Sequence, residues 1–171
     1  LGDIAKWWRE NISEDWFDIR NEAYGILQRE DTLKEIVKLL GPDALPDEEK
    51  LILEIARMVK IGLLQQNSFD DVDTYCSPEK QFKLLKLVVD FYKLGQQSLK
   101  EGTPLASIRE LPVVTSLLKA RMDIKDDEMP KLDQLEIDMK EQFKNISGVK
   151  VKNWPLKAEF NTARLLKLKD H

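Results

Sequence analysis

The residues best suited to chemistry lie together in one polar stretch, QQNSFDDVDTYCS, from position 65 to 77. The stretch holds three carboxylates within four positions: Asp70, Asp71 and Asp73. Carboxylate oxygens are the ligands that calcium prefers, but a calcium-binding loop beginning at Asp71 requires Gly at its sixth position and Glu at its twelfth. Cys76 and Phe82 occupy those positions. The spacing therefore argues against a metal site and favours aspartates that cap turns and the following helix.

No other group of side chains has the spacing of a catalytic site. The one histidine is His171, so histidine-based triads, paired-histidine metal sites and zinc fingers are excluded. The chain contains neither the G-x-x-x-x-G-K-[ST] phosphate cradle nor G-x-G-x-x-G. Acids at helical spacing, such as Asp15, Asp18 and Glu22, are typical of a solvated helix face. Since phosphoryl transfer needs the cradle, its Lys and a metal-holding acid together, we expect no ATP hydrolysis by this chain alone.

Composition and charge limit the class of protein further. The chain has 171 residues, 42% of them hydrophobic, which suffices for one sizeable core. Its 27 basic and 31 acidic residues give a net charge of −4, which argues against a general nucleic-acid or membrane-surface binder. No apolar run approaches the roughly twenty residues of a membrane span. The single cysteine, Cys76, excludes an intrachain disulfide and agrees with a reducing cytoplasm.

The element that must position the polar stretch is a helical hairpin from Asp31 to Phe69. Its first helix is predicted by apolar residues at three-and-four spacing: Leu33, Ile36, Val37 and Leu40. Gly41 and Pro42 end that helix, because Gly takes the left-handed cap conformation and Pro cannot continue the hydrogen-bond ladder. The second helix carries its own apolar stripe: Ile52, Ile55, Ala56, Val59 and Leu63.

The connection between the two hairpin helices is predicted to protrude. Pro46 suits a first helical turn, and Asp47, Glu48 and Glu49 place negative charge at the positive end of the helix dipole. If the two apolar stripes face each other or a third helix, the loop is pushed outward. We therefore expect an acidic, exposed elbow formed by Pro42, Asp43, Ala44, Leu45, Pro46, Asp47 and Glu48.

The segments before the hairpin predict one further helix and an aromatic patch. Ser13 is a favourable N-cap for a helix that ends at Asp31. One face of this helix is marked by Trp16, Ile19, Ala23, Ile26, Leu27 and Glu30. Ile4, Trp7 and Trp8 form a dense apolar start, which either packs on a neighbouring protein or folds back on the domain's own helices.

After the polar stretch, Ser77 and Pro78 open a long helix that continues to Gly102 and against which the hairpin is expected to pack. Its apolar stripe is Phe82, Leu85, Val88, Val89, Tyr92 and Leu99. Prolines and aspartates then separate a short helix, a helix from Val113 to Met122, and a final amphipathic helix that Gly148 ends. The fold class is therefore an all-α bundle built on a long hairpin, with a helical domain at 1–147 and a basic tail at 148–171.

Two runs of residues also resemble a known family. LLGPDALPDEEKL, at the elbow, and LLQQNSFDDVDTYCSPEKQ, after the second hairpin helix, are similar to the C-terminal helical domain of the catalytic A subunit of archaeal A-type and vacuolar V-type rotary ATPases. The second run is long and irregular, so chance explains it poorly. A more distant resemblance links the elbow to the F-type beta subunit, although Ala44 and Pro46 replace two positions of its acidic segment. The resemblance extends from Ile4 to about Met122.

The resemblance implies a role that the residues alone do not. In such ATPases the nucleotide state of a neighbouring domain, which holds ATP or ADP with Mg, swings this helical domain so that its elbow pushes on the central shaft. The implied partners are central stalk subunits and the adjacent non-catalytic B subunits, and the implied location is the cytoplasmic side of the membrane, reached only through the complex. By the same resemblance, Phe69 and Tyr75 contact adenine.

Two hypotheses of function therefore remain. The first is the C-terminal domain of a proton- or sodium-translocating rotary ATP synthase, which is a mechanical and adenine-contacting part of an enzyme. The second is a stand-alone helical module for protein–protein interaction, without catalysis. The chain begins with Leu1 rather than Met, which is compatible with a piece of a longer protein. A P-loop upstream of Leu1 in the same reading frame would favour the first hypothesis.

Overall fold

The computed structural model describes residues 2–64 and 76–146, and all regular structure in these ranges is helical. The elements are α1 (Gly2–Asn11), α2 (Trp16–Leu40), η1 (Pro42–Ala44), α3 (Asp47–Val59), the π-helical turn η2 (Lys60–Leu64), α4 (Pro78–Lys100), α5 (Leu105–Arg109), α6 (Pro112–Asp123), η3 (Asp126–Glu128) and α7 (Pro130–Ile146). The predicted all-α bundle is confirmed. Phe69, Tyr75, the three aspartates between them and the tail 148–171 lie outside the described residues.

The hairpin is longer than its sequence pattern indicated. A helix boundary at Asp31 is wrong, because α2 runs without interruption from Trp16 to Leu40 and spans about 37 Å. No Gly or Pro lies near Asp31 to break the hydrogen-bond ladder. Ser13 as N-cap is also wrong. Its Oγ accepts the backbone N–H of Asp15 at 3.2 Å inside the preceding turn, and Asp15 occupies the cap position.

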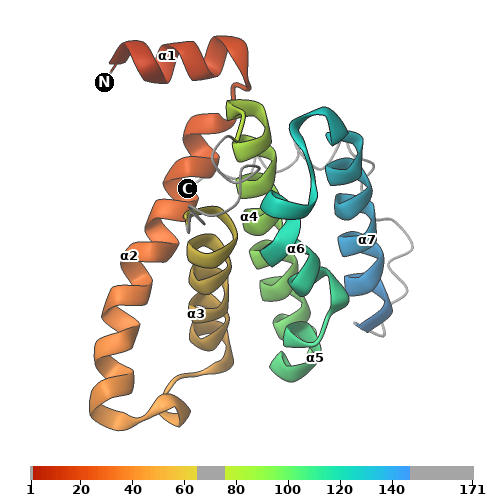
Figure 1. Cartoon of the computed structure of the whole chain (residues 1–171). Coiled ribbons are helices and arrows are strands. Elements are labelled where there is room, and N and C mark those ends of the chain that lie inside the picture. The colour runs from red at the N-terminus through yellow and green to blue at the C-terminus, as the bar shows by residue number, and fades with distance from the viewer. Residues whose placement is uncertain (1, 65–75, 147–171) are drawn as a thin grey trace.

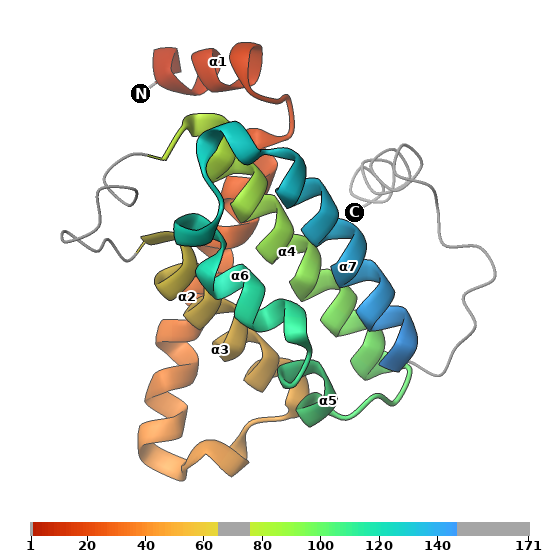
Figure 2. The same ribbon diagram turned by 45° about the vertical axis from the view of Figure 1, so that its right-hand side comes forward.

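The remaining helices form the body on which the hairpin rests. Figures 1 and 2 show α2 and α3 side by side, with α3 against α4 and the connection between α2 and α3 extending away from the bundle. Helix α7 lies along the other flank of α4, and α6 contacts both α4 and α7. The predicted N-cap at Ser77 is confirmed, since its Oγ accepts the backbone N–H of Lys80 at 3.2 Å. Because α2, α3, α6 and α7 all contact α4, this helix is the central one, as its apolar stripe predicted.

The core lies between α3, α4, α6 and α7. Helix α4 is buried on more than one side, so its interior residues exceed a single stripe: Phe82, Leu84, Leu87, Val88, Val89, Phe91 and Leu94. Phe91 meets Phe143 of α7 edge to face, with ring centroids 4.9 Å apart. The last helix, α7, is amphipathic as predicted and buries Leu132, Leu135, Met139 and Phe143. Within the described ranges, no helix has the combination of length and hydrophobicity that a membrane span requires.

Of the two expectations for the aromatic start, folding back on the domain's own helices is confirmed for Trp8, and packing on a neighbouring protein stays a prediction. Trp8 folds back and stacks on Trp16 of α2, with centroids 5.0 Å apart and planes 24° apart. Trp7 contacts Trp8 edge to face, with ring centroids 5.9 Å apart, but Trp7 remains 47% exposed. Ile4 is exposed as well. Helix α1 therefore lies across the end of α2 and leaves part of its apolar face uncovered (Figure 1).

Candidate functional site: the tip of the hairpin

The tip of the hairpin, residues 39–48, is formed by a sharp and locally determined turn. Gly41 has φ +86° and donates its N–H to the Val37 carbonyl at 2.9 Å, which caps α2 in a conformation that a side chain would strain. Pro42 then opens the short helix η1. Pro46 is extended and its carbonyl accepts from the backbone amides of Glu49 and Lys50 in the first turn of α3. The chain reverses here because Gly and the two prolines permit no continuous helix.

Most of the tip faces solvent, as the sequence predicted, with one exception. The exposed residues are Pro42, Asp43, Ala44, Pro46, Asp47 and Glu48. Leu45 is only 5% exposed and anchors the loop to the hairpin, so its expected exposure is wrong. A loop held by one buried leucine keeps a fixed shape, because complete burial of such a side chain contributes about 1.5–3 kcal/mol.

Two leucines at the tip were not identified from the sequence. Leu39 is 82% exposed and Leu40 is 73% exposed, although Leu40 was assigned to the inward stripe. That assignment is wrong because the last turn of α2 extends past the start of α3, and α3 is the helix that covers the inner face of α2. Two adjacent leucines directly before Gly-Pro were the available signal, since neighbouring helix positions point about 100° apart and cannot both be buried on a narrow stripe. The tip therefore combines apolar and acidic side chains.

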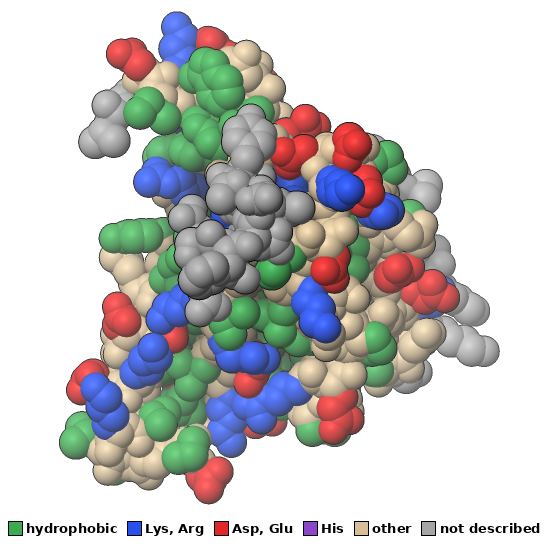
Figure 3. Space-filling view, viewed as in Figure 1, with side chains coloured by type: hydrophobic (Ala, Val, Ile, Leu, Met, Phe, Trp, Pro, Cys, Tyr) green, Lys and Arg blue, Asp and Glu red, His purple; other side chains and the backbone are tan. Residues whose placement is uncertain are grey.

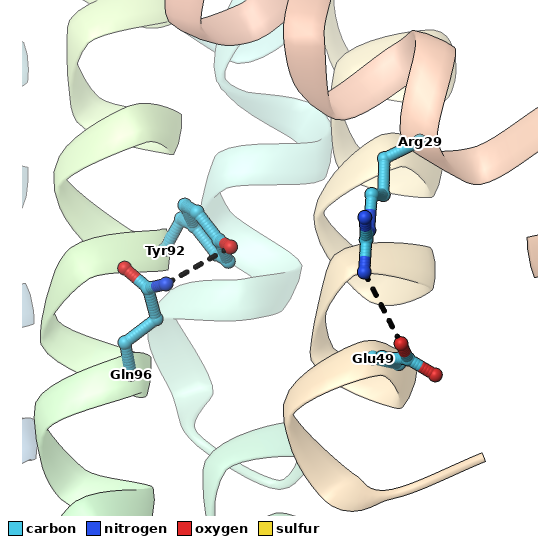
Figure 4. Close-up of polar contacts among 4 residues, drawn as sticks. All are labelled: Arg29, Glu49, Tyr92 and Gln96. Atoms are coloured by element: carbon cyan, nitrogen blue, oxygen red, sulfur yellow. Dashed lines mark hydrogen bonds and ion pairs between the residues drawn. The ribbon is translucent and has the colours of Figure 1, made fainter.

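The three acids that begin α3 do not play one common role. Glu49 is half-buried, and its Oε1 accepts from Nη2 of Arg29 on α2 at 3.2 Å (Figure 4). This contact joins the two hairpin helices near the tip. Asp47 and Glu48 remain exposed in the first turn of α3, where their negative charge meets the positive end of the helix dipole.

A hollow of about 380 Å³ lies behind this contact, between α2, α3 and α4. Ile26, Ile52 and Tyr92 form part of its lining. The Tyr92 hydroxyl accepts from the side-chain amide of Gln96 at 3.0 Å (Figure 4), and burial raises the pKa of the phenol. Lys93 of α4 binds Glu22 of α2 at 2.7 Å. The rim of the hollow thus ties the hairpin to α4.

One buried carboxylate joins α2 to the end of the second hairpin helix. Glu30, whose side chain is 6% exposed, contacts Lys34 at 2.9 Å and Lys60 of η2 at 2.7 Å. Burial alone raises the pKa of Glu30, but the ammonium groups of Lys60 and Lys34 outweigh burial and lower it below the ordinary value. The sequence had placed Glu30 on the buried face of its helix, and that placement is confirmed.

Glu30→Gln should therefore destabilise the chain at neutral pH and not at acid pH. The folded-state pKa of Glu30 is lowered, so its contribution is present above the ordinary glutamate pKa of about 4.3 and is lost as pH falls through the lower folded-state value. Both lysines are half-exposed, so we expect a loss of only about 1–2 kcal/mol in the free energy of unfolding at pH 7.

Urea unfolding at pH 7 and again well below pH 4 measures this effect. Glu35→Gln is the matched control, because Glu35 forms an exposed pair with Lys38 at 3.1 Å and should change stability little at either pH. A Glu30→Gln deficit that stays constant with pH would show that packing rather than charge is responsible.

The opposite end of the hairpin is anchored by Arg121, which Lys80 in turn holds; the sequence pattern singled out neither of these cations. Arg121 of α6 donates through Nη1 to the Leu63 carbonyl at 2.7 Å. Lys80 is almost completely buried and donates through Nζ to the Arg121 carbonyl at 2.8 Å. Gly62 also lies against α6, where an added Cβ would come 3.3 Å from the Leu117 carbonyl oxygen. The residues that flank positions 65–75 are thus held by α6.

The described residues contain no group of three or more His, Cys, Asp or Glu side chains that could hold a metal ion. The two residues assigned to adenine contact, Phe69 and Tyr75, lie outside the described ranges, and their role stays a prediction. What the described geometry provides is a long hairpin with a shaped, exposed tip, fastened to a helical body.

Comparison with known proteins identifies the class to which this architecture belongs. Residues 5–109 match the family model described as the C-terminal domain of V and A type ATP synthase, and the chain belongs to this family. Its relatives are the A subunits, or alpha chains, of such synthases, so the chain corresponds to the C-terminal domain of an A subunit.

Three relatives illustrate the match, and each is an A subunit or alpha chain of an A-type or V-type ATP synthase. The chain is 44% identical over 149 residues to the A subunit of the A-type ATP synthase of Hyperthermus butylicus, and the match covers 86% of this chain and 25% of that protein. It is 43% identical over 146 residues to the corresponding A subunit of Ignicoccus hospitalis, covering 84% and 24%. The V-type ATP synthase alpha chain of Halothermothrix orenii is 38% identical over 146 residues, covering 85% and 25%. The chain thus spans about a quarter of the length of these curated relatives.

Proposed function

We propose that this domain couples ATP synthesis or hydrolysis in an adjacent nucleotide-binding domain to rotation of a central stalk, and through that rotation to ion transport. The domain is the lever of the subunit: the nucleotide state swings it, and the hairpin tip transmits the movement. The observation that carries this proposal is the tip itself, which is exposed, shaped by Gly41 and two prolines, and fixed by the buried Leu45. The alternative, a stand-alone interaction module, has no support from the comparisons.

The packing supports a lever that moves as one piece. Arg29–Glu49 and Glu30–Lys60 join the two helices of the hairpin, and Glu22–Lys93 joins α2 to α4. Force applied at the tip is therefore passed to the body through short ion pairs as well as through the apolar core. In the complete protein the body would connect to the part that binds nucleotide.

ATP or ADP with Mg belongs to the complete subunit in this proposal. This chain lacks the phosphate cradle, so its contribution would be one wall of the adenine pocket through Phe69 and Tyr75. Partners are the central stalk subunits and the neighbouring non-catalytic B subunits. The domain would lie on the cytoplasmic side and reach the membrane only through the complex.

A cross-linking experiment tests the contact between tip and stalk. Ala44→Cys, at the exposed centre of the tip, is labelled with a photo-activated cross-linker in the assembled complex. We expect a covalent product with a central stalk subunit. The matched control is Ile137→Cys, exposed on α7, which should give no stalk product. Equal stalk labelling from both positions, or labelling of the stalk from Ile137 only, would contradict the proposal.

Phe69→Ala should weaken nucleotide binding in the complete subunit without affecting the fold. Loss of aromatic stacking on a base costs about 1–3 kcal/mol, which corresponds to roughly five- to 150-fold in affinity. The measurement is the nucleotide dissociation constant, with the melting temperature recorded beside it. The isolated 171-residue chain should bind nucleotide only in the millimolar range, or not measurably, and should release no phosphate. Unchanged affinity together with a melting temperature lower by several degrees would assign Phe69 to packing.

A further inference from the structure

We propose that the groove between α2 and α3, lined by these helices and η2, binds an acidic amphipathic helix from another protein chain. We call it the basic groove. It is separate from the tip and from the residues assigned to adenine contact. The proposal therefore goes beyond the function proposed above, and its test can fail while that function holds.

The floor of the basic groove is apolar and open. Val37 of α2, Leu53 of α3 and Ile61 of η2 contribute to the lining, and the hollow measures about 570 Å³. Ile61 is exposed although it is fully apolar. Figure 3 shows hydrophobic surface over α2 and α3 between Lys and Arg side chains. Covering such a floor removes apolar surface from water, which contributes about 25 cal/mol per Å².

The rim of the basic groove carries excess positive charge. Its two carboxylates are each shared by two cations. Glu30 contacts Lys34 and Lys60, as described above, and Glu54 contacts Arg57 at 3.5 Å and Arg109 at 3.1 Å. Each of these groups of three side chains has a net charge of +1. Their cations remain about half exposed, so they can still meet an external carboxylate.

The spacing of the lining residues fits a helix better than a small molecule. Leu53, Arg57 and Ile61 follow one another at four-residue intervals, which places them along about 12 Å of the second hairpin helix. Lys34 and Lys38 have the same interval on α2. A helix laid between two others presents apolar residues at i, i+3, i+4 and i+7 to the floor. Acidic residues on both flanks of that helix would then face Lys34 on one side and Arg57 on the other.

The probes for the test are two synthetic helical peptides that share leucines at i, i+3, i+4 and i+7. In one peptide glutamates flank the leucines, and in the other lysines replace the glutamates. Fluorescence anisotropy with the 171-residue chain at low salt should show at least about tenfold tighter binding of the glutamate peptide. Amide resonances of Val37, Leu53 and Ile61 should shift when it binds.

Charge-reversal variants locate the site. Arg57→Glu and Lys38→Glu should each weaken binding of the glutamate peptide by about tenfold. Lys119 is exposed on α6 outside the groove, so Lys119→Glu should change the affinity for this peptide by less than about twofold. Circular dichroism confirms that each variant is folded. Equal affinity for both peptides, no binding of either, or unchanged affinity in Arg57→Glu overturns the proposal. A dimer of the chain that Arg57→Glu dissociates would overturn it in favour of a second copy as the occupant.

Discussion

Shortening the hairpin tip should abolish rotation while ATP hydrolysis by the assembled complex continues. In the variant, two glycines replace Pro42–Pro46, which leaves a connection long enough to join α2 to α3. We expect this result because the tip is the part of the hairpin that extends beyond the body, and its shape depends on Gly41, the prolines and the buried Leu45. The measurements are ATP turnover and single-molecule rotation on the same preparation.

Two controls separate shape from charge and from lost burial. Neutralising the exposed acids changes charge only: Asp43→Asn, Asp47→Asn and Glu48→Gln. This variant should keep rotation and lose little stability, since such residues act locally through the helix dipole. Leu45→Ala keeps the length of the loop but removes its anchor, and should reduce coupling less than shortening does. Loss of rotation on neutralisation alone, with the fold intact, would show that coupling to the stalk depends on the charge of the tip.

Leu51→Ala should cost about 2–5 kcal/mol in the free energy of unfolding and lower the melting temperature by roughly 5–15 °C. Leu51 is fully buried where α3 crosses α4, and its side chain lies against Gly95. An added Cβ at Gly95 would come 2.9 Å from the Leu51 Cδ2 atom. This close approach is what fixes the hairpin on the body.

The same contact predicts that Gly95→Ala changes the stability in opposite directions with and without the Leu51 side chain. Gly95→Ala alone should destabilise by up to about 2 kcal/mol, because overpacking against Leu51 exceeds the gain of about 1 kcal/mol in helix propensity. In the Leu51→Ala background the clash is gone, so Gly95→Ala should stabilise by about 1 kcal/mol. Urea unfolding of the four proteins in this double-mutant cycle measures both effects. Additive effects at the two positions would mean that α3 and α4 are not in contact there.

Periodicity and turn residues were sufficient for most of the fold. Gly41-Pro42, Ser77-Pro78 and Pro112 mark real helix ends, because Gly and Pro act on the backbone regardless of tertiary context. The boundary expected at Asp31 was wrong for the converse reason. No Gly or Pro supported a boundary at Asp31, and a change in the composition of the apolar stripe does not end a helix.

What sequence could not supply are contacts between distant segments. Lys80 can be almost fully buried because its ammonium group donates a hydrogen bond to the Arg121 carbonyl, 41 residues away. Leu40 is exposed because the last turn of α2 extends past the start of α3. The same holds for the basic groove, whose cations lie on α2, α3 and η2 and gather only when the hairpin closes. The roles of Phe69 and Tyr75 remain predictions that follow from the family resemblance.

Domain replacement tests the lever most directly. The matching segment of the Hyperthermus butylicus protein, to which this chain is 44% identical over 149 residues, is exchanged for the corresponding residues of this chain in the assembled complex. ATP-driven rotation of single complexes is then recorded. We expect rotation with the intact domain and none with the domain whose Pro42–Pro46 is replaced by two glycines, at similar ATP turnover. Complexes that hydrolyse ATP without rotating when they carry the intact domain, or that rotate normally with the shortened tip, would contradict the proposed coupling.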